Sequence, residues 1–111
     1  MRHFSILFFA LLAFFVSTAL EAEGIAERGK AKAAKVCAAC HGADGAKPAA
    51  PENPILAGQY ADYLARALTD YQSGKRANPV MKPFADQLSK FDIQDLAAWF
   101  SSQKSNLHVQ R

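Results

Sequence analysis

The amino-acid sequence predicts an all-α fold, a single small domain of helices without a sheet. Two stretches repeat apolar residues at the spacing of one helix face. No stretch alternates apolar and polar residues with the period of two that strands require, and no repeat of about 20–50 residues occurs. The residues at helical spacing are Tyr60, Leu64, Leu68 and Tyr71 in the first stretch, and Ile93, Leu96, Ala97 and Phe100 in the second.

The first residues of the chain have the pattern of an export signal. A short basic start at residues 1–3 precedes an apolar run from Phe4 to Val16, and small residues follow it. We expect residues 1–19 to be a signal peptide removed after Ala19, with Ala22 as the second candidate. The alternative is an uncleaved membrane anchor, but the run has 13 residues, whereas a spanning helix needs about 20.

Removing residues 1–19 leaves 92 residues, which we expect to form one domain over 20–111. The formal charge falls only from +3 to +2, because Arg2 is the only charged residue lost, so nucleic-acid binding is not expected. A domain of this size often needs a staple, such as disulfides, a metal or a large apolar cofactor. In an oxidising compartment, Cys37 and Cys40 would be consumed either in a disulfide or in thioethers.

The first half of the domain is predicted to hold two helices and a long loop. Residues 21–35 are rich in Ala, Glu and Lys, with acidic residues early and lysines late, which favours a helix. Gly29 lies in its middle at a cost of about 1 kcal/mol, so close approach by another element is expected there. Three prolines and two glycines in 42–54 predict a loop. The second helix is predicted over Gln59 to Gln72, with Gly74 as its stop.

The second half is predicted to hold a short helix and a long one. Pro83 suits the first turn of a short helix that runs to about Leu88. The segment Ser89-Lys90-Phe91-Asp92 has the pattern of a capping box, in which the Ser and Asp side chains each bond a backbone N–H of the other. The last helix therefore begins here, and we expect it to end near Gln103.

The stretch Cys37-Ala38-Ala39-Cys40-His41 is the cluster that indicates a specific chemistry. Two thiols three positions apart can add to the two vinyl groups on one edge of a porphyrin, and the adjacent imidazole can then reach the iron. This Cys-x-x-Cys-His spacing is a known signature of c-type haem attachment. We therefore predict one covalently attached haem c, held by Cys37 and Cys40, with His41 as an axial ligand of its iron.

Two other uses of these residues are less favoured. A structural zinc site needs four ligands, and the adjacent Cys40 and His41 are poorly placed to share one tetrahedron. His108, the only other histidine beyond the predicted signal, lies in a polar tail where solvation is expected. A thiol-redox Cys-x-x-Cys usually accompanies a βαβ pattern, and the sequence has none.

The second axial ligand decides what the iron can do. An open position would permit ligand binding or peroxide chemistry, whereas a filled one restricts the iron to passing electrons. Met81 is the only methionine beyond the predicted signal, and Pro79 and Pro83 stiffen the segment around it. Methionine usually fills gaps in apolar cores, but these surroundings favour Met81 as the ligand. A thioether favours Fe(II) and raises the reduction potential.

Together these features give the chain a strong resemblance to the class I cytochromes c. It is most similar to the single-haem bacterial periplasmic type and to either half of the two-haem periplasmic cytochromes. The resemblance covers residues 20–111 and rests on Gly29, Cys37 to Gly42, Pro54 to Gln59, Met81, and Leu88 to Phe100. It implies a small cytochrome c fold in which the first and last helices cross and the helices wrap around one haem.

The resemblance also implies roles that the pattern alone does not assign. Gly29 would let the first helix cross the last near Leu96, Trp99 and Phe100. The carbonyl of Pro54 would accept the Nδ1 proton of His41, which fixes the imidazole and increases its basicity. The residues that would line the haem are Leu56, Leu64 and Leu68, and those that could contact its distal side or a propionate are Tyr63, Tyr71 and Arg76.

The resulting prediction is a periplasmic carrier of single electrons, and not an enzyme. Its partners would be redox proteins, a donor and an acceptor such as an oxidase, reductase or dehydrogenase; we expect a monomer without a membrane span in the mature chain. The alternatives are a haem peroxidase or gas-binding protein with an open distal position, or a bound electron-transfer subunit of a larger dehydrogenase. Basic residues expected near the haem rim would either steer an acidic partner or be ordinary solvated side chains: Lys47, Lys75, Arg76, Lys82 and Lys90.

Overall fold

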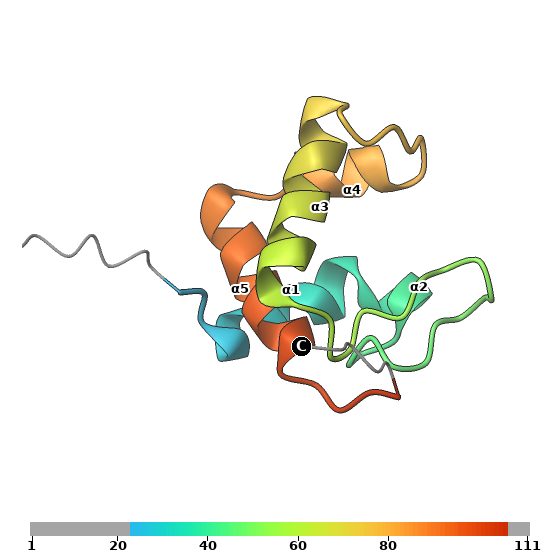
Figure 1. Cartoon of the computed structure of the whole chain (residues 1–111), viewed down its shortest axis with the longest axis vertical. Coiled ribbons are helices and arrows are strands. Elements are labelled where there is room, and N and C mark those ends of the chain that lie inside the picture. Colours follow the sequence, from blue (N-terminus) through green and yellow to red (C-terminus); the bar gives the residue numbers. More distant parts are fainter. Residues whose placement is uncertain (1–22, 107–111) are drawn as a thin grey trace, which may run out of the picture.

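The computed structural model describes residues 23–106, and this part of the chain is helical without a strand (Figure 1). The predicted signal peptide and His108 lie outside these residues. Figure 1 shows α1 and α5 crossing, with α3 and α4 at the top of the view and α2 with its following loop lower down. The helices are α1 (Ala26–Val36), α2 (Ala38–His41), α3 (Ala61–Ser73), α4 (Met81–Asp86) and α5 (Lys90–Ser101).

The crossing of α1 and α5 is the main helix contact, and Gly29 makes it possible. Gly29 and Ala33 form the buried face of α1. A Cβ at Gly29 would overlap the backbone carbonyl of Asp95 and would come within 2.8 Å of Trp99 Cβ, so only glycine fits. The predicted crossing is therefore confirmed: Gly29 approaches Asp95, one residue before the expected Leu96, and Trp99, which was expected.

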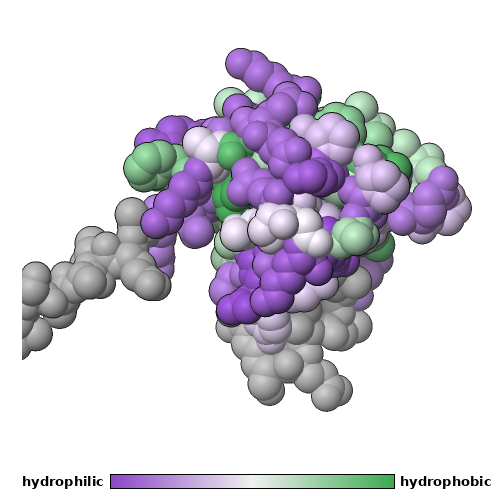
Figure 2. Space-filling view, turned by 90° about the horizontal axis from the view of Figure 1, so that it is seen from above, coloured by the Kyte–Doolittle hydropathy of each residue, from purple (hydrophilic) through white to green (hydrophobic). Residues whose placement is uncertain are grey.

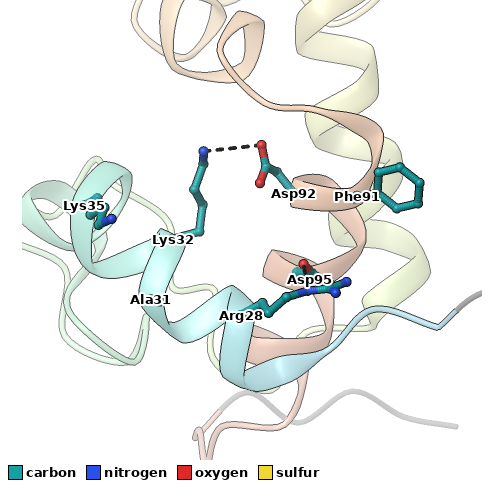
Figure 3. Close-up of a pocket in the computed structure, with 7 residues that line it drawn as sticks. All are labelled: Arg28, Ala31, Lys32, Lys35, Phe91, Asp92 and Asp95. Carbon is teal, nitrogen blue, oxygen red and sulfur yellow. Dashed lines mark hydrogen bonds and ion pairs between the residues drawn. The ribbon is translucent and has the colours of Figure 1, made fainter.

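Hydrogen bonds and ion pairs stabilise the crossing of α1 and α5 (Figure 3). The Arg28 guanidinium bonds both carboxylate oxygens of Asp95, at 2.8 Å from Nε and 3.1 Å from Nη2, and the Ile25 N–H donates to Asp95 Oδ1 at 2.7 Å. Lys32 pairs with Asp92 at 3.3 Å. The Asp95 carboxylate is buried, and the hydrogen bond from Arg28 lowers its pKa below its ordinary value. Because its donors are all in place, this carboxylate stays charged although it is buried.

The start of α1 differs from the prediction, which placed the helix from residue 21. Within the described residues the chain from Glu23 to Ile25 is not helical, and α1 begins at Ala26. The reason is tertiary: the N–H of Ile25 is used by Asp95, and Gly24 lies so close to the backbone of Gln94 that a Cβ would overlap it. Contact with α5 thus overrides the helix propensity of this segment.

The loop after α2 contains no helix or strand up to residue 60, as its prolines and glycines predict. It is held against α5 instead. Trp99 Nε1 donates to the Ala43 carbonyl at 3.2 Å, and the Gly58 N–H donates to the Phe100 carbonyl at 2.9 Å. These bonds join segments far apart in the sequence, so the loop follows a defined path over the end of α5.

The remaining helix ends follow local signals with small shifts. Gly74 ends α3 in the left-handed conformation, with φ +81°. The predicted capping box of α5 is confirmed, since Ser89 Oγ accepts from Asp92 N and Asp92 Oδ2 accepts from Ser89 N. The short helix α4 ends two residues before the predicted Leu88, and α5 ends at Ser101. Sequence patterns therefore located these elements to within a few residues.

The core lies where α1, α3 and α5 meet. Among the described residues, no helix is both long enough and apolar enough to span a bilayer. Figure 2 looks down from above and shows hydrophilic residues over most of that face, with hydrophobic residues emerging in separate patches. The core cluster consists of Ala33, Leu64, Leu88, Ile93, Leu96, Ala97 and Phe100. The large apolar side chains that are exposed include Ile25, Ile55, Tyr63, Val80, Phe84 and Phe91.

The crossing predicts that Gly29→Ala destabilises the protein. Helix propensity alone would make this change stabilising by about 1 kcal/mol. Because the new Cβ would overlap the Asp95 carbonyl, we expect instead a loss of more than about 3 kcal/mol in the free energy of unfolding, measured by urea denaturation. Ala34→Gly, on the exposed face of the same helix, is the control and should cost only about 1 kcal/mol. A stabilised Gly29→Ala protein would contradict the crossing.

The Arg28–Asp95 contact predicts an acid-dependent part of the stability. Asp95 has a lowered pKa in the folded state, so its contribution is present above its ordinary value of 3.8 and is lost as the pH falls below it. Asp95→Asn should reduce the free energy of unfolding at pH 7 by about 1–2 kcal/mol. It should also make the difference between urea unfolding at pH 7 and at pH 3 smaller than in the wild type. An unchanged pH dependence would show that Asp95 contributes nothing to it.

Candidate haem site

One apolar cavity of about 420 Å³ gathers all the residues that the sequence predicted for the haem. Its volume lies within the range of about 300–1,000 Å³ that is usual for small-molecule and cofactor sites. Residues from every helix line it, together with the loop after α2. The predicted residues that line it are Cys37, Cys40, His41, Pro54, Leu56, Leu64, Leu68 and Met81.

His41 is the most firmly placed of these residues. Its side chain is buried, and its Nδ1 lies 3.0 Å from the carbonyl oxygen of Pro54, the contact that the resemblance implied. A carbonyl can only accept, so Nδ1 donates in this bond, and in the neutral imidazole Nε2 then keeps its lone pair. Nε2 has no hydrogen-bond partner among the described residues, and the imidazole lines the cavity. The ring therefore presents a free nitrogen donor in the tautomer that a metal ligand needs.

Backbone contacts hold the segment around His41 in place. The helix α2 has only four residues and ends at His41, and the next residue, Gly42, caps it with a φ of +85° that suits glycine. The Cys40 carbonyl accepts from the Ala49 N–H at 3.0 Å and from Asn53 Nδ2 at 3.1 Å, which draws the following loop back to the helix. The contribution of Asn53 was missed in the sequence, because an Asn among three prolines is an ordinary loop residue.

The two cysteines differ in exposure: Cys37 is half-buried, and Cys40 is exposed. Burial raises the pKa of the Cys37 thiol to about 11, although Lys32 opposes the change. Reactive redox cysteines have lowered pKa values and are thiolates at neutral pH, so this thiol does not fit that class. The described residues also contain no group of three or more His, Cys, Asp or Glu that could hold a metal ion. Both less favoured uses of the motif thus lack support in this part of the chain.

Met81 reaches the same cavity from a different element. It is the first residue of α4, and Asn78 turns the chain into this helix. Asn78 Oδ1 accepts from the N–H groups of Val80 and Met81, at 2.9 and 3.0 Å. Prolines alone were expected to stiffen this segment, and no role was predicted for Asn78, although an Asn-Pro pair is a turn signal. His41 and Met81 thus come to one cavity from α2 and from α4.

These walls fit an iron porphyrin. The ring needs a flat apolar space, and leucine side chains and other apolar groups make up most of the lining. The iron needs a nitrogen and a second soft or nitrogen ligand, and the two vinyl groups need thiols; His41, Met81, Cys37 and Cys40 supply these groups. Among the residues that line the cavity, only Glu52 and Arg76 are side chains that are charged at neutral pH. The donor set and the polarity of the cavity therefore both match a haem.

Arg76 is the one member of the predicted basic set that lines the cavity. Its Nη1 lies 3.3 Å from the hydroxyl of Tyr63, and its guanidinium lies 4.9 Å from the ring centroid of Tyr71. Lys82 is engaged elsewhere, because its Nζ pairs with Asp86 at 3.1 Å. The structure thus brings together the three residues named for the distal side or a propionate, but it does not gather the predicted lysines at the cavity.

A second hollow lies on the surface between α1 and α5 (Figure 3). It is open and has a volume of about 640 Å³. Both of its carboxylates, Asp92 and Asp95, are paired with lining cations. None of the residues predicted to hold the haem lines it, so it does not compete with the apolar cavity as the cofactor site.

Comparison with known proteins identifies the family. Residues 24–100 match the family model described as cytochrome c oxidase, cbb3-type, subunit III. The chain is 49% identical over 86 residues to cytochrome c4 of Pseudomonas aeruginosa, covering 78% of this chain and 42% of that protein. It is 45% identical over 71 residues to cytochrome c-554(548) of Halomonas halodenitrificans, covering 61% of this chain and 84% of that protein.

A solved structure shows the same fold. The crystal structure of reduced cytochrome c4 from Pseudomonas stutzeri matches with a TM-score of 0.68 at 42% identity, covering 76% of this chain and 48% of that one. The chain thus spans about half the length of the cytochromes c4 that it matches. The cofactor of this family is covalently attached haem c, and Cys37 and Cys40 fit its attachment motif. The chain therefore belongs to the class I c-type cytochromes, in the family described as cytochrome c oxidase, cbb3-type, subunit III.

Proposed function

We propose that the protein is a periplasmic carrier of single electrons whose haem is attached through Cys37 and Cys40 and ligated by His41 and Met81. The observation that carries the proposal is the convergence of an imidazole, a thioether and two thiols on one apolar cavity. When bound, the haem iron takes up and gives up one electron. The similarity to cytochrome c4 and cytochrome c-554(548) over the matched residues supports the same activity.

The side chains around the cavity would set the properties of this centre. The Pro54 carbonyl holds the Nδ1 proton of His41, which fixes the ring and increases the basicity of Nε2. The thioether of Met81 would raise the reduction potential relative to a second histidine. The leucines at 56, 64 and 68 line a mostly apolar space, and a low dielectric around the iron would also tune the potential.

An enzyme with an open iron position is the less favoured function. A peroxidase or gas-binding protein needs one axial position free and polar side chains placed over it. His41 is the only histidine among residues 23–106, and it is already engaged with Pro54. Arg76 lines the cavity but bonds Tyr63 and stacks on Tyr71. These contacts favour electron transfer without catalysis.

The partners of such a carrier would be a donor and an acceptor among redox proteins, such as an oxidase, reductase or dehydrogenase. We further propose that residues 1–19 are a cleaved signal peptide and that the mature protein is a monomer, with residues 20–111 as its cytochrome domain. A bound subunit of a larger dehydrogenase would differ from a free carrier in one respect. It would co-purify with that enzyme under native conditions, whereas a free carrier would not.

Replacing Met81 tests the ligand set. Met81→Leu keeps the volume of the side chain but removes the thioether, so the weak far-red absorption band that reports sulfur-to-iron ligation in the oxidised protein should disappear. Met81→His should also lack the band but keep a second ligand, and its potential in a redox titration should be lower than that of the wild type. Absence of the far-red band in the wild-type protein, or rapid binding of carbon monoxide to it, would contradict the proposed ligation by Met81 and the proposed role as an electron carrier.

Removing both thiols tests attachment and export in one measurement. The intact mass of protein from the periplasmic fraction should correspond to a chain beginning at residue 20, or at residue 23 for cleavage after Ala22, plus one haem that survives denaturation. Cys37→Ala combined with Cys40→Ala should leave the start of the chain unchanged and should remove the haem mass. A colourless wild-type protein would overturn the proposed haem attachment. An unprocessed chain in the membrane fraction would overturn the proposed signal cleavage and periplasmic location.

A further inference from the structure

The helix that carries Met81 cannot be stable by itself. α4 has six residues, and isolated helices shorter than about 12–15 residues are marginal in water. Only Ala85 of this helix is buried. The position of Met81 therefore depends on bonds that tie α4 to a longer element.

Gln72, near the end of α3, provides such bonds. Its side-chain Nε2 donates to the carbonyls of Ala85 and Leu88, at 2.7 and 2.8 Å. Its own backbone carbonyl accepts from Nζ of Lys82 at 2.9 Å, and Lys82 directly follows Met81. One residue of α3 thus bonds α4 at both of its ends.

The carbonyls that Gln72 satisfies are ones that a short helix leaves exposed. The last carbonyls of a helix lack i+4 partners, and the Ala85 carbonyl is reached within its own turn by the Gln87 N–H and by the Leu88 N–H, the latter at 3.0 Å. Gln72 is half-buried, so water does not replace its amide freely. Without this amide, α4 and the turn to Leu88 would open more often as a local unit.

We propose that Gln72 is a positioning residue that holds Met81 on the iron by clamping α4 to α3. The inference rests on the proposed ligation by His41 and Met81. It adds that the bonds of Gln72 determine how long the sulfur–iron bond lasts. When the clamp opens, α4 moves away from the cavity and the Met81 sulfur leaves the iron. No electron is transferred in this step, and the bond re-forms when α4 closes.

The test measures how fast Met81 leaves the iron in the oxidised holoprotein. Free imidazole binds the iron only after the sulfur–iron bond breaks, so at saturating imidazole the spectral change occurs at the rate of opening. Gln72→Leu keeps apolar bulk but has no donor, and it should raise this limiting rate about tenfold or more. Hydrogen exchange of the α4 amides should accelerate in parallel, a readout that does not involve the haem.

Gln87→Leu is the matched control. Gln87 Nε2 also donates to a carbonyl of this helix, that of Pro83 at 3.1 Å, but the bond is local and does not reach α3. Its loss should leave the limiting rate within about twofold of the wild type. A Gln72→Leu rate within twofold of the wild type, or an equal acceleration in Gln87→Leu, would overturn the proposal.

A second pair of variants keeps the proposal testable if Gln72→Leu does not fold. Lys82→Ala removes the bond to the Gln72 carbonyl together with the Lys82–Asp86 ion pair, whereas Asp86→Ala removes the ion pair alone. The first should accelerate opening about threefold, and the second should not; equal rates would refute the clamp. Absence of the far-red band in the wild type would instead show that the proposed ligation itself is wrong.

Discussion

The approach of α1 to α5 at Gly29 sets the geometry on which the haem site depends. Because the two backbones touch there, the direction of α1 relative to α5 has little freedom. Cys37 directly follows the last residue of α1, so that direction also sets where the attachment motif begins. The adjacent face of α5 supplies Leu96 and Phe100 to the cavity wall. The close approach that glycine permits at position 29 thus fixes where the attachment motif lies relative to the cavity wall formed by α5.

The two sides of the cavity are held by different means. His41 is buried, its ring bonds a loop carbonyl, and the attachment cysteines are its neighbours in the chain. Met81 is the first residue of a six-residue helix that is bonded by Asn78 at its start and by Gln72 at both ends. The proximal side is therefore fixed by several overlapping constraints, while the distal side depends on a few hydrogen bonds. Such bonds contribute only about 0.5–1.5 kcal/mol each.

Local patterns predicted most of the fold because its helix ends carry local signals. The capping box at Ser89 and the stop at Gly74 lie within a few residues of what they control, so the sequence reveals them. The predicted start of α1 was wrong because the hydrogen bond that determines where this helix begins, from Ile25 to Asp95, spans 70 positions. Residue propensities carry no information about a partner so distant in the chain.

The site was predictable to a similar degree, and for a related reason. All eight predicted residues line one cavity. They could be named in advance because each belongs to a motif whose spacing or resemblance points to a haem. The supporting residues were missed: Asn53, Gln72 and Asn78 act through amide groups on backbone carbonyls or N–H groups. An amide side chain in a loop or at a helix end has no distinctive pattern. Only the arrangement of the folded backbone shows which of them matter.

The contact between α1 and α5 also orders events during folding. The bond from Ile25 to Asp95 joins residues 70 positions apart, so the small-residue face of α1 has no partner until the last helix packs against it. Contacts between distant parts of a chain also form slowly, because loop closure must precede them. The cysteines lie just beyond α1, on the segment that waits for this closure. The position of the attachment motif relative to the cavity wall is thus fixed only when the last helix packs against α1.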